Sequence, residues 1–136
     1  MSNAPRAAIL DRPLTAVVAT TNHNGSPHAV PVWFRHEPDS GRIRVWSDAS
    51  RHWVRNLLRD PRCSITIAEH EAPFAGCLAS CTATVHQDAD WAGAEIHAIT
   101  ARYIPAPDVD AYIAQYPFRT IVEFTPGRSR VWDQGY

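Results

Sequence analysis

Lysine is missing from this sequence, and all 13 basic residues are arginines. A Schiff base to pyridoxal phosphate requires a lysine amine, and the P-loop of nucleotide-binding proteins ends in a lysine that reaches the phosphates. Two common classes of phosphate-using protein are therefore excluded. The chain also contains no G-x-S-x-G segment, so the local geometry of an acyl hydrolase is missing as well.

Cysteine is scarce, and its spacing argues against a metal site or a disulfide framework. The three cysteines, Cys63, Cys77 and Cys81, form no C-x-x-C pair and are odd in number. The seven histidines show no spacing that would assemble a metal triad, so we expect no metal. Cys77 and Cys81 are an even number of positions apart on a predicted strand, and we expect both to be buried on the same face.

Long apolar runs and an excess of one charge are also missing. No stretch approaches the roughly 18 to 20 apolar residues that span a bilayer, and residues 1–13 contain no signal-peptide core. The formal net charge is −1, from 13 basic and 14 acidic groups, so no positive field favours nucleic acid. We expect a soluble cytoplasmic protein that binds neither membranes nor nucleic acid.

The sequence does contain a strong β pattern. Runs of β-branched and alternating apolar residues predict strands, and the Asn24-Gly25 pair between the first two runs predicts an antiparallel hairpin. Pro31 cannot donate to a β-ladder, so the second strand is expected to be interrupted or to lie at a sheet edge. The predicted strands cover residues 15–22, 28–35, 43–48, 63–71 and 77–88, followed by a final hairpin of residues 119–126 and 128–133 around Gly127.

A helix is predicted between residue 50 and Pro61. Ser50 is the favoured N-cap, with Asp48 as the competing cap. Arg51 and Arg55 lie four positions apart and share one helix face, where they and the free amides of the first turn would suit a phosphate. A surface helix with solvated arginines is the alternative. The neighbouring apolar face should dock on the sheet through Trp53, Val54, Leu57 and Leu58.

Two further helical segments follow the fifth strand. Apolar residues recur at helical spacing at Ala92, Ile96, Ile99 and Tyr103, and a shorter segment covers residues 108–116. Together, the elements predict a mainly β (α+β) fold: six to seven antiparallel strands in a small barrel or sandwich, with flanking helices.

The order of three segments resembles a known family. The strand PHAVPVWF, the strand end VWSDAS and the helix VRNLLRDPR, in this order, look like the pyridoxamine 5′-phosphate oxidase-like proteins and their deazaflavin-dependent relatives. The resemblance implies a split β-barrel of the type that binds flavin mononucleotide (FMN), formed as a single domain by residues 1–136. It further implies a homodimer with FMN, or alternatively the deazaflavin coenzyme F-420, at the subunit interface, and an oxidoreductase that transfers a hydride to or from a small organic substrate.

The same resemblance implies which residues bind the cofactor. The second strand would lie beside the flavin ring, the end of the third strand and the helix start would hold the phosphate, and the C-terminal strand would reach the partner's flavin. In this chain these positions are His28, Val30, Pro31, Val32, Trp33, Trp46, Ser47, Asp48, Ser50, Arg51, His52, Arg55, Asn56, Arg130 and Trp132. Relatives commonly carry a lysine where this chain has Trp53, so the phosphate would rely on Arg51, His52 or Arg55.

Several alternatives stay open at this level. Trp33 and Trp46 would also suit a core or a dimer interface instead of a cofactor site. Because the lysine is replaced, a non-catalytic cofactor-binding or haem-binding split-barrel dimer competes with the oxidoreductase. No catalytic side chain is assigned, since the flavin itself would perform the hydride chemistry. The sequence does not identify the substrate.

Overall fold

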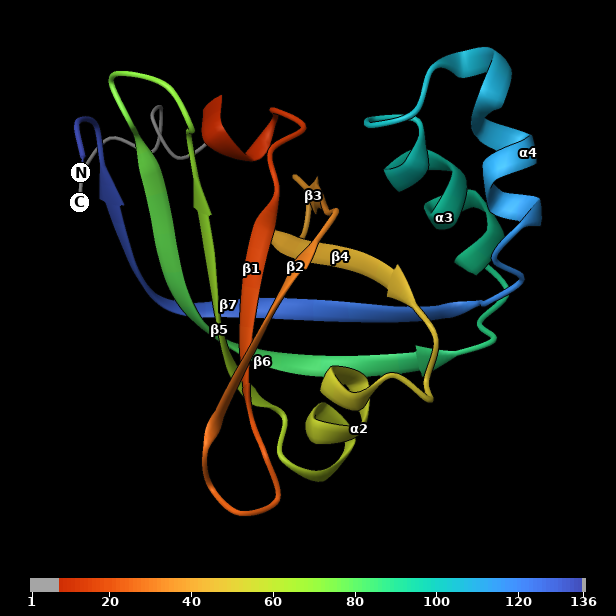
Figure 1. Ribbon diagram of the computed structural model, residues 1–136, viewed down its shortest axis with the longest axis horizontal. Coiled ribbons are helices and arrows are strands. Elements are labelled where there is room, and N and C mark those ends of the chain that lie inside the picture. The colour runs from red at the N-terminus through yellow and green to blue at the C-terminus, as the bar shows by residue number, and fades with distance from the viewer. Residues whose placement is uncertain (1–7, 136) are drawn as a thin grey trace.

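The computed structural model describes residues 8–135, and the first half of the N-terminal segment considered above, residues 1–7, lies outside this range. One antiparallel sheet of seven strands, in the order β2-β1-β5-β6-β7-β4-β3, forms the frame of the molecule (Figure 1). The strands are β1 (Ala16–Thr21), β2 (Pro27–Val32), β3 (Arg35–Glu37), β4 (Arg42–Ser47), β5 (Arg62–Ala68), β6 (Gly76–Gln87) and β7 (Thr120–Trp132). The helical elements are α2 (His52–Arg59), α3 (Ala92–Thr100), the 3-10 turn η1 (Ala106–Asp108) and α4 (Val109–Ala114).

The connection between β2 and β3 explains why the sheet curls. These two strands form the opposite edges of the sheet, yet only Trp33 and Phe34 separate them in the chain. Val32 and Arg35 are three residue steps apart and so can be at most about 11 Å from each other, which means that the edges must come together at this point. The sheet therefore wraps into a partly closed barrel, as Figure 1 shows, and closes on a core that includes Val18, Phe34 and Phe124.

The hairpin of β1 and β2 has the predicted form. The turn contains Asn24 and Gly25, and Gly25 adopts the positive φ of 88° that favours glycine. β1 pairs with β2 in register from Ala16 opposite Val32 to Thr21 opposite Pro27. Because β2 is an edge strand, Pro31 removes no hydrogen bond from the interior of the sheet, as predicted.

The second predicted strand, residues 28–35, is wrong in its C-terminal part. The strand ends at Val32, and Phe34 donates its backbone N–H to the Tyr103 hydroxyl oxygen at 3.1 Å instead of to a β-ladder. Trp33 stacks on the Tyr103 ring, with 4.7 Å between centroids and 4° between planes. One distant tyrosine therefore interrupts the strand and turns the chain toward β3.

The predicted final hairpin around Gly127 is also wrong, because residues 120–132 form one long strand. β7 pairs with β6 over its whole length, with an irregularity between Ala79 and Cys81. Opposite this point, Gly127 and Arg128 together face Ser80, which is the arrangement of a β-bulge. A bulge accommodates Pro126 and Gly127 within a strand, so these residues do not form a turn here.

The start of α2 differs from the predicted capping. Arg51 occupies the N-cap position, and its side chain makes no capping hydrogen bond. Ser50 cannot cap because it is used elsewhere: its hydroxyl and its backbone N–H both donate to Asp48, at 2.6 and 3.1 Å. Leu58, predicted in the apolar face, is 53% exposed, and Asn56 is buried instead.

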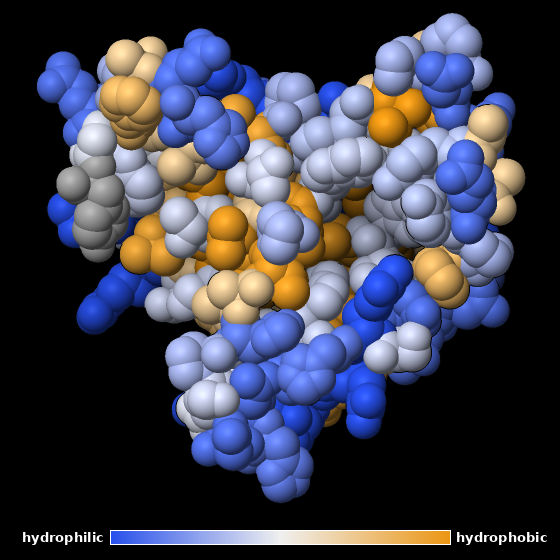
Figure 2. Space-filling model, in the orientation of Figure 1, coloured by the Kyte–Doolittle hydropathy of each residue, from blue (hydrophilic) through white to orange (hydrophobic). Residues whose placement is uncertain are grey.

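Other packing predictions are confirmed. Cys77 and Cys81 are buried on the same side of β6, and Ala92, Ile96 and Ile99 form the buried face of α3. Figure 2 shows apolar side chains gathered on the middle of one face, over the region of β1 and β2, while the end that carries the β1–β2 turn is hydrophilic. None of the helices within residues 8–135 is both long enough and apolar enough to cross a membrane.

Candidate cofactor site

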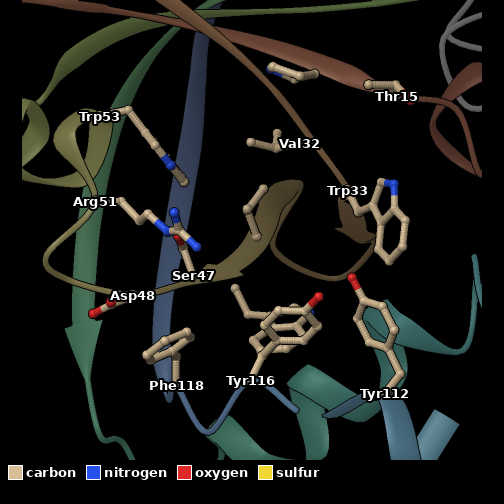
Figure 3. A pocket seen from close by; sticks show the side chains of 13 residues that line it. Thr15, Val32, Trp33, Ser47, Asp48, Arg51, Trp53, Tyr112, Tyr116 and Phe118 are labelled. Carbon is tan, nitrogen blue, oxygen red and sulfur yellow. The ribbon is translucent and has the colours of Figure 1, made fainter.

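A cavity of about 490 Å³ lies where β2 and β4 approach the start of α2 and the segment that begins with α4 (Figure 3). Small-molecule sites commonly have volumes of roughly 300 to 1,000 Å³, so this cavity is large enough for a cofactor. Its walls are formed by Thr15, Pro31, Val32, Trp33, Val45, Trp46, Ser47, Asp48, Arg51, Trp53, Tyr112, Tyr116 and Phe118.

One end of the cavity is polar. Ser47 ends β4, Asp48 and Ser50 form the turn that follows, and the Arg51 side chain extends into the cavity from the start of α2 (Figure 3). Hydrogen bonds from the Ser50 hydroxyl and backbone N–H lower the pKa of Asp48, which is therefore ionised at neutral pH. Arg51 is the only cation among the described residues that line this cavity.

The first turn of α2 offers additional hydrogen-bond donors. The N-terminal amides of a helix have no partners within the helix, and Arg51 does not cap them with its side chain. The helix dipole adds a partial positive charge at the same end. A negatively charged group in the cavity would therefore find both a guanidinium and free backbone amides.

The other end of the cavity is aromatic. Trp33 lies 5.6 Å from Tyr112, with 31° between the ring planes, and Tyr112 lies 5.1 Å from Tyr116. Behind them, the Tyr103 hydroxyl donates to the Leu14 carbonyl at 2.8 Å, which fixes the ring on which Trp33 stacks. Figure 3 shows Trp33, Tyr112 and Tyr116 side by side, across the cavity from Arg51.

The chain matches the protein-family profile described as pyridoxamine 5′-phosphate oxidase over residues 5–133. It belongs to the pyridoxamine 5′-phosphate oxidase family. No curated protein sequence matches this chain.

Solved structures agree with this family and show the fold to be a split β-barrel. A conserved hypothetical protein from Mycobacterium tuberculosis superposes with a TM-score of 0.82 at 22% identity, covering 98% of this chain and 85% of the other. An F-420 reductase gives a TM-score of 0.70 at 21% identity, covering 90% of this chain and 94% of the other. The haem storage protein HutZ from Vibrio cholerae gives 0.74 at 17% identity, covering 100% and 97%.

The structure brings together about half of the residues that the family resemblance pointed to. Those that line the cavity are Pro31, Val32, Trp33, Trp46, Ser47, Asp48 and Arg51. The others, which do not line it, are His28, Val30, Ser50, His52, Arg55, Asn56, Arg130 and Trp132. The strand segment and the residue that precedes α2 thus line one cavity, while Arg55 and Asn56, further along the helix, do not line it.

Two residues of α2 are engaged with β1 and its turn. Asn56 is fully buried, and its amide donates to the Thr20 hydroxyl and to the Asn22 side-chain oxygen, each at 3.0 Å. The His52 ring bonds to the same Asn22 oxygen at 2.7 Å and contacts the His28 ring edge-on at 4.7 Å between centroids. These contacts fasten the helix that presents Arg51.

The C-terminal residues lie in a separate part of the molecule. Trp132 donates its indole N–H to the Phe74 carbonyl at 3.0 Å, next to the loop between β5 and β6. Figure 1 shows this end of β7 at the opposite side of the sheet from α4. Within one chain, Arg130 and Trp132 are therefore outside the cavity, and only a partner subunit could bring them to it.

Sequence reasoning missed six lining residues, which are Thr15, Val45, Trp53, Tyr112, Tyr116 and Phe118. Trp53 stands where relatives commonly have a lysine, and its indole packs into the core beside the cavity instead of supplying a charge. Tyr112 and Tyr116 follow the prolines at positions 105 and 107, about 80 residues after β2. No local sequence pattern links the two segments. Within residues 8–135, no group of His, Cys, Asp and Glu side chains is arranged to hold a metal ion.

Proposed function

We propose that this protein is a flavin-dependent oxidoreductase that transfers a hydride to or from a small organic substrate. The observation that carries the proposal is the position of Arg51: its side chain enters the same cavity that is lined by Pro31 and Val32 of β2 and by Trp33, the residue after this strand. The polar end of that cavity suits a phosphate, and the β2 backbone beside it suits the edge of a planar ring, which are the two parts of a flavin coenzyme.

The residues present fit such a group. The guanidinium of Arg51 and the uncapped first turn of α2 favour an anion. Asp48 lines the same end and opposes an anion, but its carboxylate is turned to Ser50. β2 pairs only with β1, so half of its backbone groups face away from the sheet and are available to a polar ring edge.

We assign the following roles to the chain's own groups. Arg51 donates hydrogen bonds to the phosphate, Ser47 contributes its hydroxyl, and the backbone of residues 30–33 orients the ring. The apolar side chains of Trp53 and Val45 line the cavity and keep water away from the part of its wall that they form. When bound, the flavin supplies the hydride chemistry, and the protein supplies position and electrostatics.

FMN is the cofactor we favour, with the deazaflavin coenzyme F-420 as the alternative, because both join a tricyclic ring to a phosphorylated side chain. The remaining residues from the family resemblance keep their proposed role through a homodimer. Arg130 and Trp132 would reach the partner's cofactor, and His28, Val30, Ser50, His52, Arg55 and Asn56 would support or border the site from outside the cavity.

A non-catalytic haem-binding dimer is the second candidate. It is supported by the fold likeness to HutZ, which covers the whole of this chain, and by the loss of the lysine at Trp53. His28 and His52, whose rings are in contact, could supply a haem ligand, and His52 directly follows Arg51 in the chain.

The absorbance spectrum and the mass of the molecule that copurifies with the protein distinguish these candidates. Flavin bands with the mass of FMN support the proposal. A colourless protein that turns over only with reduced F-420 supports the deazaflavin variant, and a Soret band identifies haem. Recovery of no cofactor, together with no binding of added FMN or F-420, would contradict the oxidoreductase.

The role of Arg51 is tested by titrating FMN, or F-420 if that is the coenzyme found, into single variants. Arg51→Ala should weaken binding by about 1.5 to 3 kcal/mol, the typical contribution of a charged hydrogen bond. Arg55→Ala tests the second arginine of the predicted pair and should have a smaller effect. Arg128→Ala, at an exposed position of β7 outside the cavity, is the matched control. Equal affinities for wild type and Arg51→Ala would place the phosphate elsewhere.

A further inference from the structure

The aromatic end of the cavity has its own chemical character. Among the described residues that line the cavity, the two charged ones, Asp48 and Arg51, both lie at the polar end. Trp33, Tyr112 and Tyr116 present ring faces and hydroxyls but no cation. The polar end therefore suits a charged group, whereas the aromatic end suits an uncharged ring.

The rings at this end are held in place. Trp33 is stacked on Tyr103, which is fixed by its hydrogen bonds with Leu14 and Phe34. Tyr112 belongs to α4, which is anchored by the buried Val109, and Tyr116 lies two residues after the end of that helix. A rigid aromatic surface loses little conformational entropy when it binds a flat molecule.

The electrostatics of this wall favour an uncharged occupant. Burial and the neighbouring Tyr116 raise the pKa of Tyr112, so its hydroxyl remains protonated at neutral pH. None of the described residues that line this end carries a positive charge, so an anionic ring would lose its hydration there without gaining a cationic partner. A neutral ring is therefore favoured over an anionic one.

We propose that Tyr112 and Tyr116 of the α4 segment, together with Trp33, form the substrate subsite, and that it selects a planar, uncharged aromatic compound. The inference rests on the proposed function, since the substrate would lie between this wall and the flavin ring supported by β2. It goes beyond that function by naming the class of substrate and the residues that recognise it.

The test uses two probes that differ in charge, 2-naphthol and naphthalene-2-sulfonate. Their binding to the FMN-loaded protein is measured by isothermal titration calorimetry. The neutral 2-naphthol should bind at least about tenfold more tightly than the sulfonate. Equal or tighter binding of the sulfonate would overturn the assignment of an uncharged substrate.

Paired variants test the aromatic wall itself. Tyr112→Ala should weaken 2-naphthol binding by about five- to tenfold, because one aromatic contact is removed. Tyr112→Phe, which keeps the ring, should bind within about twofold of wild type. Circular dichroism of each variant verifies the fold. If Tyr112→Phe loses as much affinity as Tyr112→Ala, the hydroxyl and not the ring face recognises the ligand, and the inference is wrong.

A competition experiment separates failure of this inference from failure of the proposed function. Addition of 2-naphthol should leave bound FMN in place. Displacement of FMN would show that the aromatic wall holds the cofactor ring itself, which overturns the substrate subsite and keeps the flavin. Conversely, if the protein binds no flavin but still prefers 2-naphthol through Tyr112, the proposed function fails while the recognition of neutral aromatic compounds stands.

Discussion

Asn56 is a polar side chain in an apolar setting. Trp53, Val54 and Leu57 of the same helix pack into the core, while the Asn56 amide bonds to Thr20 and Asn22 of β1 and its turn. Arg59 contributes a further hydrogen bond to the Asn56 oxygen at 3.3 Å and another to the Thr21 carbonyl. These contacts fix the rotation of α2 about its axis and so the direction in which Arg51 points.

Asn56→Ala should therefore destabilise the protein by about 1 to 3 kcal/mol, because it leaves the buried Thr20 hydroxyl without this partner. Urea unfolding followed by circular dichroism measures the loss. Leu58→Ala is the control on the same helix, since that side chain is exposed and its truncation should change the free energy of unfolding by about 0.5 kcal/mol at most. An Asn56→Ala variant with the wild-type midpoint would show that the amide is dispensable.

Single residues explain what the sequence could and could not predict about the site. Arg51 could be predicted because it stands at a helix start directly after a strand end, which is a local pattern. Ser50 was misassigned as the cap because its competing hydrogen bonds with Asp48 depend on the loop geometry. Tyr112 and Tyr116 could not be predicted, since about 80 residues separate them from Trp33 and no periodicity connects the two segments.

Five elements are tied together by a network of ion pairs around two buried carboxylates. Arg35 of β3 and Arg44 of β4 both bond to Glu95 of α3, at 2.6 Å for the shortest contact of each. Arg44 also bonds to Glu123 of β7 at 2.8 Å, and His86 of β6 contacts the same carboxylate at 3.2 Å. The network fastens α3, and with it the α4 segment, to the edge of the barrel.

The network predicts a loss of stability in acid. Burial alone would raise the pKa of Glu95, but the hydrogen bonds from Arg35 and Arg44 outweigh it and leave this pKa below the usual 4.5. The pKa of Glu123 is lowered in the same way by Arg44 and His86. The unfolded chain therefore takes up protons first, so the stabilisation is complete above about pH 4.5 and is lost as the pH falls through the folded-state values.

Denaturant unfolding at several pH values between 7 and 3 measures this effect. Glu95→Gln should lower the free energy of unfolding at pH 7 by about 1 to 3 kcal/mol and flatten its decline below pH 4.5. Glu71→Gln, at an exposed position between β5 and β6, should follow the wild-type curve. A Glu95→Gln variant that still declines as steeply as wild type would assign the acid sensitivity to other groups.

At the level of whole elements, the alternation of apolar and polar residues predicted most strands. It failed where pairing with a distant strand determines where a strand ends. β4 and β6 have nearly the predicted ranges because their buried faces repeat every second residue. Pro126 and Gly127 suggested a turn, but β6 is long enough to pair on both sides of them, and a bulge opposite Ser80 absorbs the extra residue. Local composition cannot report the length of a partner strand.

The whole molecule is predicted to be a homodimer. Apolar side chains gather on one face over the region of β1 and β2, and Val17 of β1 is among the large apolar residues that remain exposed (Figure 2). Contiguous exposed apolar surface of this kind favours an interface. Analytical ultracentrifugation over a dilution series should give twice the chain mass of 15.2 kDa. A monomer at micromolar concentration, with cofactor bound, would show that one chain forms a complete site.

The overall curvature could not be derived from the strand predictions, because only one edge of the sheet was recognised. Pro31 predicts β2 as an edge, whereas β3 was not predicted: only its first residue, Arg35, lies within the predicted strand of residues 28–35. Only the interaction of Trp33 and Phe34 with Tyr103, about 70 residues later, separates the two strands. The same contact that closes the barrel also supplies the platform of the aromatic wall.

The position of β7 in the sheet determines the order in which the strands can pair while the chain is being synthesised. β7 is the last strand along the chain, yet it lies between β6 and β4 in the sheet. A nascent polypeptide that has emerged from the ribosome only as far as α4 can form the β1–β2 hairpin and the β5–β6 pair, but β4 has no neighbour on its inner side. The cavity wall built on β4 therefore gains its inner neighbour only after residues 120–124 of β7 have left the ribosome.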